Sequence, residues 1–149
     1  MSNVLQILVE QAKEKADECA KALAKTRQQL AQSQDKLAML ESYRDECQAA
    51  LLNRSQTGIT GMQLQGQLLY NSKIDTALKQ QGDEIRFLQN SVEKQLAAWQ
   101  GVLAEQKKYE TLLQREAQKM AAIQNKREQK MNDEYAARIY RTQTAGESR

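Results

Sequence analysis

Two very long helical patterns are separated only by the stretch Asn53-Arg54-Ser55-Gln56-Thr57-Gly58-Ile59-Thr60-Gly61. Thr60 and Gln63 fit a capping box, in which each side chain accepts a hydrogen bond from a backbone N–H at the start of a helix. Gly58 supplies one position without steric restriction, and Asn53 is suited to the left-handed conformation that closes a helix. This stretch therefore predicts a short turn between two helices.

Both patterns place apolar or small residues alternately three and four residues apart. This alternation averages 3.5 residues per turn, so each helix should carry a seam that supercoils left-handedly against a partner. A short turn makes each helix the natural partner of the other. The first series runs through Cys19, Leu23, Thr26, Leu30, Ser33, Leu37, Leu40, Cys47 and Leu51, with Arg44 as its one charged member; the second runs through Ile74, Leu78, Gln81, Ile85, Leu88, Val92, Gln95, Trp99, Val102, Gln106, Tyr109 and Leu113.

The predicted fold is all-α, a long antiparallel two-helix coiled-coil hairpin with unequal arms. It forms one domain over 1–141, in which the first helix spans about 3–52, the turn 53–61 and the second helix about 61–141. Residues 142–149 lack periodicity and are expected to form a disordered tail. The turn sets Leu40 opposite Ile74 and the chain start opposite Tyr109. Near that start, Leu5, Leu8 and Ala12 keep the spacing, but the phase must slip by one residue before Leu23.

The composition argues against an enzyme. The 149 residues include no histidine, which excludes Ser-His and Cys-His nucleophiles and histidine-bearing metal sites. Neither a phosphate-binding glycine loop nor closely spaced cysteines are present. Cys19 and Cys47 lie on one helix about 42 Å apart by helical rise, too far for a disulfide. We expect no catalytic, cofactor-binding or metal-binding residues and no cofactor.

The same sequence predicts a cytoplasmic protein without direct membrane insertion. No run of apolar residues approaches the roughly 18 that a membrane span requires. The first residues lack the basic region and apolar core of a secretory signal. The formal charge of +3 is small, and the short basic stretch Lys126, Arg127, Lys130 is interrupted by Glu128. We therefore expect no nucleic-acid partner.

The second helix is longer than the first, so everything from about Leu112 onward should lack an intramolecular partner. A helix of this kind is only marginally stable in water when it has no partner. It is therefore either a frayed tail or a segment that docks into another protein. Its apolar residues are Leu113, Met120, Ile123, Met131, Tyr135 and Ile139, and its basic residues are Arg115, Lys119, Lys126, Arg127, Lys130, Arg138 and Arg141.

A second candidate surface lies near the turn. The antiparallel register brings Tyr43 and Tyr70 close together beside the seam. Tyrosines in this position either cover the seam or anchor a partner, because tyrosine is enriched in protein interfaces. Their neighbours are Leu40, Cys47, Ile74 and Ala77.

Several segments resemble the flagellar FliJ family, cytoplasmic components of the bacterial flagellar type III export apparatus. Chain length, unequal arms and the short glycine-containing turn are similar, and the resemblance covers most of residues 4–138. The strongest segment is Lys130 to Ala136, similar to a Lys-x-x-Asp-Glu-aromatic-Ala signature. The other matching segments are Leu37 to Glu46, Gly58 to Thr60, Leu96 to Trp99 and Tyr109 to Leu113.

The resemblance implies a fold like the central stalk (gamma) subunit of rotary ATPases. It implies a stalk that binds the hexameric flagellar export ATPase, promotes assembly of its ring, contacts the cytoplasmic domain of the export gate protein and escorts late-substrate export chaperones. Cys47 and Gln81 depart from the residues that the family carries at those positions. The gate-binding residues implied are Lys36, Leu40, Tyr43, Cys47, Tyr70, Ile74, Ala77 and Gln81. The residues expected to contact the ATPase ring are Leu5, Leu8, Leu113, Met120, Ile123, Arg127, Met131, Tyr135 and Arg138.

Two alternatives share the hairpin. The first is the equivalent stalk protein of a virulence-type injectisome, which has the same architecture. The second is a generic coiled-coil spacer or holdase chaperone, which predicts no preference for an ATPase ring.

Overall fold

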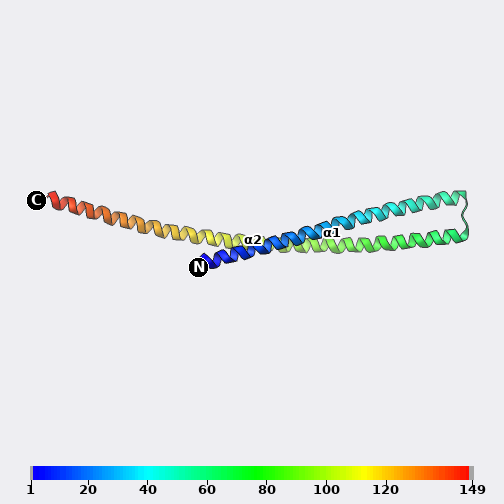
Figure 1. Ribbon diagram of the computed structural model, residues 1–149, viewed down its shortest axis with the longest axis horizontal. Helices are drawn as coiled ribbons and strands as arrows, with labels where there is room; N and C mark the ends of the chain where they lie inside the picture. The colour runs from blue at the N-terminus through cyan, green and yellow to red at the C-terminus, as the bar shows by residue number, and fades with distance from the viewer. Residues whose placement is uncertain (1, 148–149) are drawn as a thin grey trace. The chain divides into compact units, whose positions relative to one another are not determined.

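The computed structural model describes residues 2–147 as two helices joined by a short turn. The helices are α1 (Ser2–Thr57) and α2 (Gly61–Glu147), and the hairpin is drawn in Figure 1. The all-α helical hairpin is confirmed. The chain divides into two compact units, one formed by Lys15–Gly101 and the other by Met1–Glu14 with Val102–Arg149.

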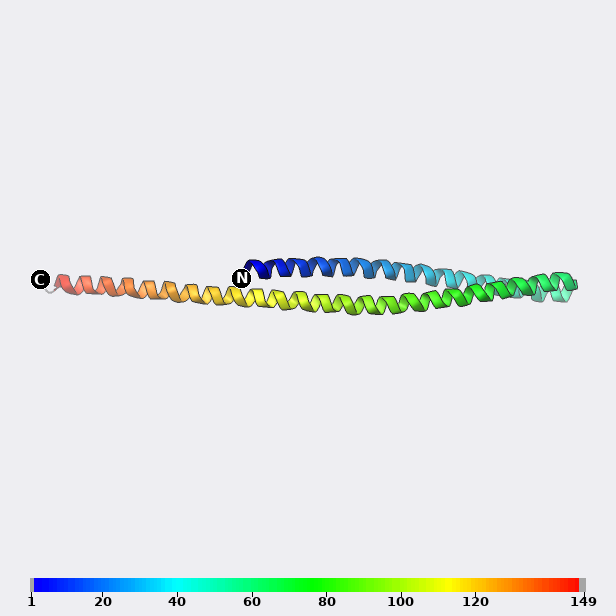
Figure 2. The same cartoon turned by 90° about the horizontal axis from the view of Figure 1, so that it is seen from below.

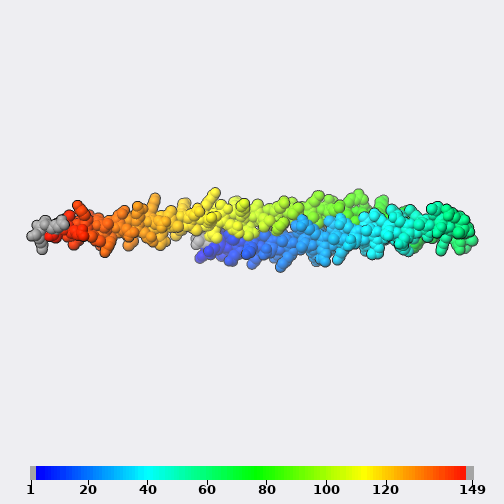
Figure 3. Space-filling view, turned by 90° about the horizontal axis from the view of Figure 1, so that it is seen from above, coloured from blue at the N-terminus to red at the C-terminus, as the bar shows by residue number. Residues whose placement is uncertain are grey.

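Within Lys15–Gly101, α1 and α2 run side by side in opposite directions (Figures 1 and 2). The space-filling view shows their side chains in contact along this unit (Figure 3). The predicted seam is confirmed, because every position of both series in this unit is buried or half-buried. The most buried apolar side chains of the seam here are Leu23, Ile74, Ile85 and Leu88.

The register of this unit is fixed by one buried hydrogen bond. Gln81 is only 7% exposed, and its Nε2 donates to the backbone oxygen of Ser33 at 3.0 Å. Ser33 lies seven residues before Leu40, and Gln81 lies seven residues after Ile74. Because the two helices are antiparallel, a contact between Ser33 and Gln81 implies the predicted pairing of Leu40 with Ile74. Ser33 is itself buried, and its small side chain leaves room for the amide to reach the opposite backbone.

The turn is shorter than predicted. α1 continues to Thr57 instead of ending near Leu52, and the hydroxyls of Ser55 and Thr57 donate hydrogen bonds to carbonyls one turn earlier. The left-handed closing residue is Gly58, with a φ of 104°, and its N–H donates to the Arg54 oxygen at 2.9 Å. The assignment of that conformation to Asn53 was wrong, since Asn53 remains inside the helix.

The predicted capping box begins α2. The Gln63 N–H donates to Thr60 Oγ1 at 3.2 Å, and the Thr60 N–H donates to Gln63 Oε1 at 3.4 Å. These reciprocal bonds satisfy backbone donors that have no partner within the helix. Local side-chain chemistry therefore sets the start of α2 where the sequence placed it.

The phase slip in α1 lies between Ala12 and Ala16. The covered positions are Leu5, Leu8, Ala12 and Ala16, so two successive intervals of four residues replace the alternation. Such an extra step locally unwinds a left-handed coiled coil. Both alanines are only 4% exposed, which shows that small side chains occupy the slip.

In the unit that contains the chain start, α2 is covered only as far as Glu116. Val102, Gln106, Tyr109, Leu113 and Glu116 are half-buried, and residues 117–146 are all exposed. Loss of the partner therefore occurs about one helical turn later than the predicted position near Leu112. We call residues 117–146 the overhang.

The helix also extends further than expected. α2 continues to Glu147, so the predicted end at Arg141 and the disordered tail are wrong for residues 142–147. Thr142 and Thr144 each donate a hydroxyl hydrogen bond to the carbonyl four residues earlier, an arrangement that occurs within helices. The remainder of the predicted tail, residues 148–149, lies outside the described residues.

We predict that Gly58→Ala destabilises the hairpin by roughly 1–2 kcal/mol, because a side chain is strained at a left-handed φ. Gly101→Ala is the matched control. Gly101 lies within α2 with no atom near an added Cβ, so this change should stabilise by up to about 1 kcal/mol through helix propensity. Urea unfolding of both variants measures the two effects. Equal effects of the same sign would contradict the role given to Gly58.

We predict that Gln81→Ala lowers the free energy of unfolding by about 1–3 kcal/mol, since it removes a buried hydrogen bond and packed atoms. The adjacent Gln80 is exposed, and Gln80→Ala should change stability by less than about 0.5 kcal/mol. Thermal or urea unfolding compares the two variants. If both lose the same stability, the bond to Ser33 does not hold the helices together.

Candidate interaction surfaces

The tyrosine pair is the first candidate surface, and it lies in Lys15–Gly101. The rings of Tyr43 and Tyr70 meet edge to face with centroids 6.1 Å apart, and their hydroxyls are hydrogen-bonded to each other. The predicted proximity is thus confirmed. The hydrogen bond with Tyr70 is the largest cause that raises the pKa of Tyr43 above its ordinary value. Tyr43 therefore remains a neutral hydrogen-bonding group near neutral pH.

Both tyrosines are available to a partner. Tyr43 is 43% exposed and Tyr70 is 42% exposed, although each ring covers part of the other. An exposed phenol on a rigid helix presents apolar area with one polar atom at its end. The pair therefore has the chemistry of an interface anchor.

The other residues implied for this surface differ in their accessibility. Ile74 and Gln81 are buried in the seam, so they position the helix and cannot contact a partner without separation of the helices. Leu40, Cys47 and Ala77 are half-buried, and Lys36 is exposed. The surface available for direct contact is therefore narrower than the full predicted set.

Met39 also belongs to this surface, although its place in the sequence did not predict it. It is 70% exposed and lines a shallow hollow together with Leu40, Ser42, Tyr43 and Glu46. Met39 lies outside the seam periodicity, so seam analysis does not select it. Its position four residues before Tyr43 is the signal that places both on one helix face.

The overhang is the second candidate surface. Its apolar residues are not covered by the chain: Met120 is 64% exposed, and Met131 and Tyr135 are each 68% exposed. Ile123 and Ile139 are also exposed. Of the residues expected to contact the ATPase ring, Leu5, Leu8 and Leu113 are half-buried, while Met120, Ile123, Arg127, Met131, Tyr135 and Arg138 are all exposed.

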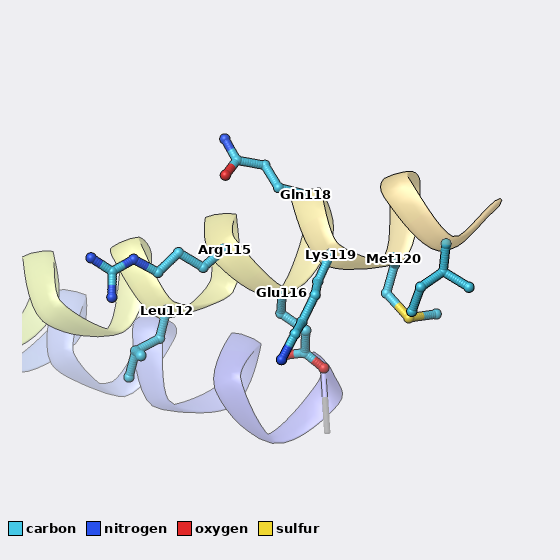
Figure 4. Close-up of a pocket in the computed structure, with 7 residues that line it drawn as sticks. Leu112, Arg115, Glu116, Gln118, Lys119 and Met120 are labelled. Atoms are coloured by element: carbon cyan, nitrogen blue, oxygen red, sulfur yellow. The ribbon is translucent and has the colours of Figure 1, made fainter. Parts of the chain in front are cut away.

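A hollow marks the point at which the cover of α2 ends (Figure 4). Leu112, Glu116 and Lys119 point toward the side on which the first turns of α1 lie, whereas Gln118 points away. Glu116 Oε2 is buried and accepts no hydrogen bond from any of the described residues. Leu112 was not among the predicted contact residues, because it lies beside the seam. The residues that line the hollow are Leu112, Arg115, Glu116, Gln118, Lys119, Met120 and Ile123.

The overhang also holds the net charge of the protein. Residues 117–146 contain six Lys or Arg against three Asp or Glu, a net charge of +3. The whole chain has the same formal net charge, so the remaining residues are neutral as a group. Neither of the two ion pairs among residues 2–147 lies in the overhang. The overhang therefore combines exposed apolar side chains with a net positive charge.

Within the described part of the chain, no group of side chains is arranged to hold a metal ion. None of the described helices is both long enough and apolar enough to cross a membrane.

Comparison with known proteins identifies one family. The family described as Flagellar FliJ protein matches residues 1–145, which is nearly the whole chain. No curated protein and no solved structure matches. The family match agrees with the resemblance carried by the turn and by the segment around Asp133 and Glu134. The chain thus belongs to the flagellar FliJ family and is a protein of flagellar export.

Proposed function

We propose that this protein is a non-enzymatic stalk of the flagellar type III export apparatus, at the cytoplasmic base of the flagellum. In this proposal the overhang binds the hexameric export ATPase and promotes assembly of its ring. The observation that carries the proposal is the combination of exposed apolar side chains and net positive charge in residues 117–146.

An exposed helix of this composition needs a partner to bury its apolar side chains. Single helices gain most of their stability in proteins from packing, and contiguous exposed apolar surface marks interaction sites. The net charge of +3 in the overhang favours a partner with acidic groups around an apolar lining. A ring of subunits around a central helix can supply such a lining on all sides.

The spacing of the exposed residues in the overhang also argues against a single partner helix that packs as α1 does. Its exposed face continues through Ile123, Arg127, Met131, Tyr135 and Ile139 at intervals of four residues. Four exceeds the 3.6 residues of a helical turn, so this stripe drifts in the sense opposite to a heptad seam. A left-handed two-helix coiled coil would leave part of the stripe uncovered.

The second part of the proposal assigns the tyrosine pair to the export gate. Tyr43 and Tyr70, with Met39 and the accessible parts of Leu40 and Cys47, would contact the cytoplasmic domain of the gate protein. The support is the exposed pair of rings and the family's position for this surface. Late-substrate chaperones are the third proposed partner, and this chain would carry them between the ATPase and the gate.

We predict that the double variant Met131→Glu, Tyr135→Glu weakens binding to the export ATPase roughly 100-fold. Each buried apolar side chain contributes about 1.5–3 kcal/mol, and both new charges would face an acidic lining. Titration calorimetry, ATPase rate and ring assembly by electron microscopy measure the effect. All measurements use the ATPase of the same organism.

The double variant Ala122→Glu, Gln129→Glu is the control for this test. It adds the same charge to the opposite side of the overhang, where both residues are exposed, and should retain most of the binding. A chain that ends after Glu116 keeps all half-buried residues and should not stimulate the ATPase. If the full chain neither binds nor stimulates the ATPase, the spacer or holdase function replaces the stalk.

We predict that Tyr70→Ala lowers the affinity for the cytoplasmic domain of the export gate at least about tenfold, as removal of a central aromatic anchor does. Tyr140→Ala is the matched control, because Tyr140 is an exposed tyrosine of the overhang. Calorimetry with the purified gate domain measures both. An equal loss for the two variants, or no loss for Tyr70→Ala, would exclude the tyrosine pair as the gate surface.

A further inference from the structure

The end of the hairpin in Lys15–Gly101 exposes a second set of apolar side chains that the proposed function does not use. Met62 is 86% exposed, Leu52 65% and Leu69 60%. They come from both helices next to the turn, the turquoise end of Figure 3. We call this set the tip surface, and its members are Leu52, Met62, Leu64, Leu68 and Leu69.

The tip surface has almost no charge around it. Between Glu46 and Lys73, Arg54 is the only charged residue. The chain as a whole is 28% charged, so a segment of this length would contain about seven charged residues at the average density. The surrounding polar residues are mainly glutamine, serine and threonine. Removing these side chains from water costs less free energy than removing charged side chains.

The seam near the turn is correspondingly polar. Its half-buried positions include Arg44, Gln67 and Asn71, and the Gln67 amide donates to Asn71 Oδ1 at 3.5 Å. Two apolar side chains of this part of α2, Leu68 and Leu69, lie outside the seam between the helices and are exposed. The last turns of the hairpin therefore bury little apolar surface of their own and would gain stability from an external cover.

We infer that a second copy of this chain covers the tip surface and forms a reversible tip-to-tip dimer. A two-fold interface places the same patch against itself, so any net charge in the patch meets like charge. The overhang, with net +3, is unsuited to such a contact. The tip surface is apolar and almost uncharged, and therefore meets a copy of itself without repulsion.

The same composition argues against a lipid bilayer as the occupant. Helices that lie in the membrane interface are rich in Lys and Arg on the polar face and often carry Trp or Phe on the other. Between Glu46 and Lys73 there is one Arg, and there is no Lys, Trp or Phe. The interface is small, so the dimer forms and dissociates with protein concentration.

The test is sedimentation equilibrium of the full chain at increasing concentration, in low and in high salt. The mass should rise from one chain toward two, and high salt should not weaken the dimer because the contact is apolar. The double variant Leu68→Lys, Leu69→Lys should raise the dissociation constant at least about tenfold. Both positions are exposed, so circular dichroism should show unchanged helix content.

The matched control is Met131→Lys, Tyr135→Lys, which adds the same charge to the overhang and should dimerise like the natural chain. The inference is overturned if the natural chain stays monomeric at all concentrations. It is also overturned if only the overhang variant loses the dimer, or if high salt dissociates it. Binding of a monomeric chain to phosphatidylcholine vesicles would replace the second copy with a bilayer.

Discussion

Burial of one narrow stripe on each helix is the interaction on which the rest of the structure depends. A helix pair in Lys15–Gly101 has no other element to pack against, so its stability comes from seam residues such as Leu23, Ile74 and Ile85. No side chain among residues 3–146 is completely enclosed. A core this thin offers no interior in which to build a site. Function has to be located on the flanks of the seam and on helix that the seam leaves uncovered.

The unequal lengths of the helices determine where uncovered helix occurs. α1 has 56 residues and α2 has 87, so α1 cannot cover all of α2. The uncovered part differs from the rest of the chain in charge, because residues 117–146 carry a net charge equal to that of the whole chain. Apolar side chains alone would favour indiscriminate association. Combined with positive charge, they favour an acidic partner and disfavour a second copy, whereas the nearly neutral surface near Met62 and Leu69 has the opposite preference.

Most of the fold could be predicted because the seam periodicity is long and repeated. The alternation of three and four residues predicted the seam, and the position of the turn then set Leu40 opposite Ile74 and Tyr43 close to Tyr70. Helix ends could not be predicted equally well: both Asn53 and Gly58 are residue types that can close a helix in the left-handed conformation, and only Gly58 adopts it. Exposed contact residues such as Met39 and Leu69 were missed for another reason. Periodicity identifies what a helix buries and contains no information about what it leaves accessible.

The polar members of the seam explain why the tyrosine pair can form reliably. A seam of identical leucines would tolerate a shift of one helix by seven residues, because each leucine would meet another. The Gln81 amide has its partner in the Ser33 carbonyl, and a shift of that size would place it against Thr26 or Leu40 instead. The same shift would separate Tyr43 from Tyr70. A glutamine in the seam buries less apolar area than a leucine would, but it favours a single register. The tyrosine pair exists only in that register.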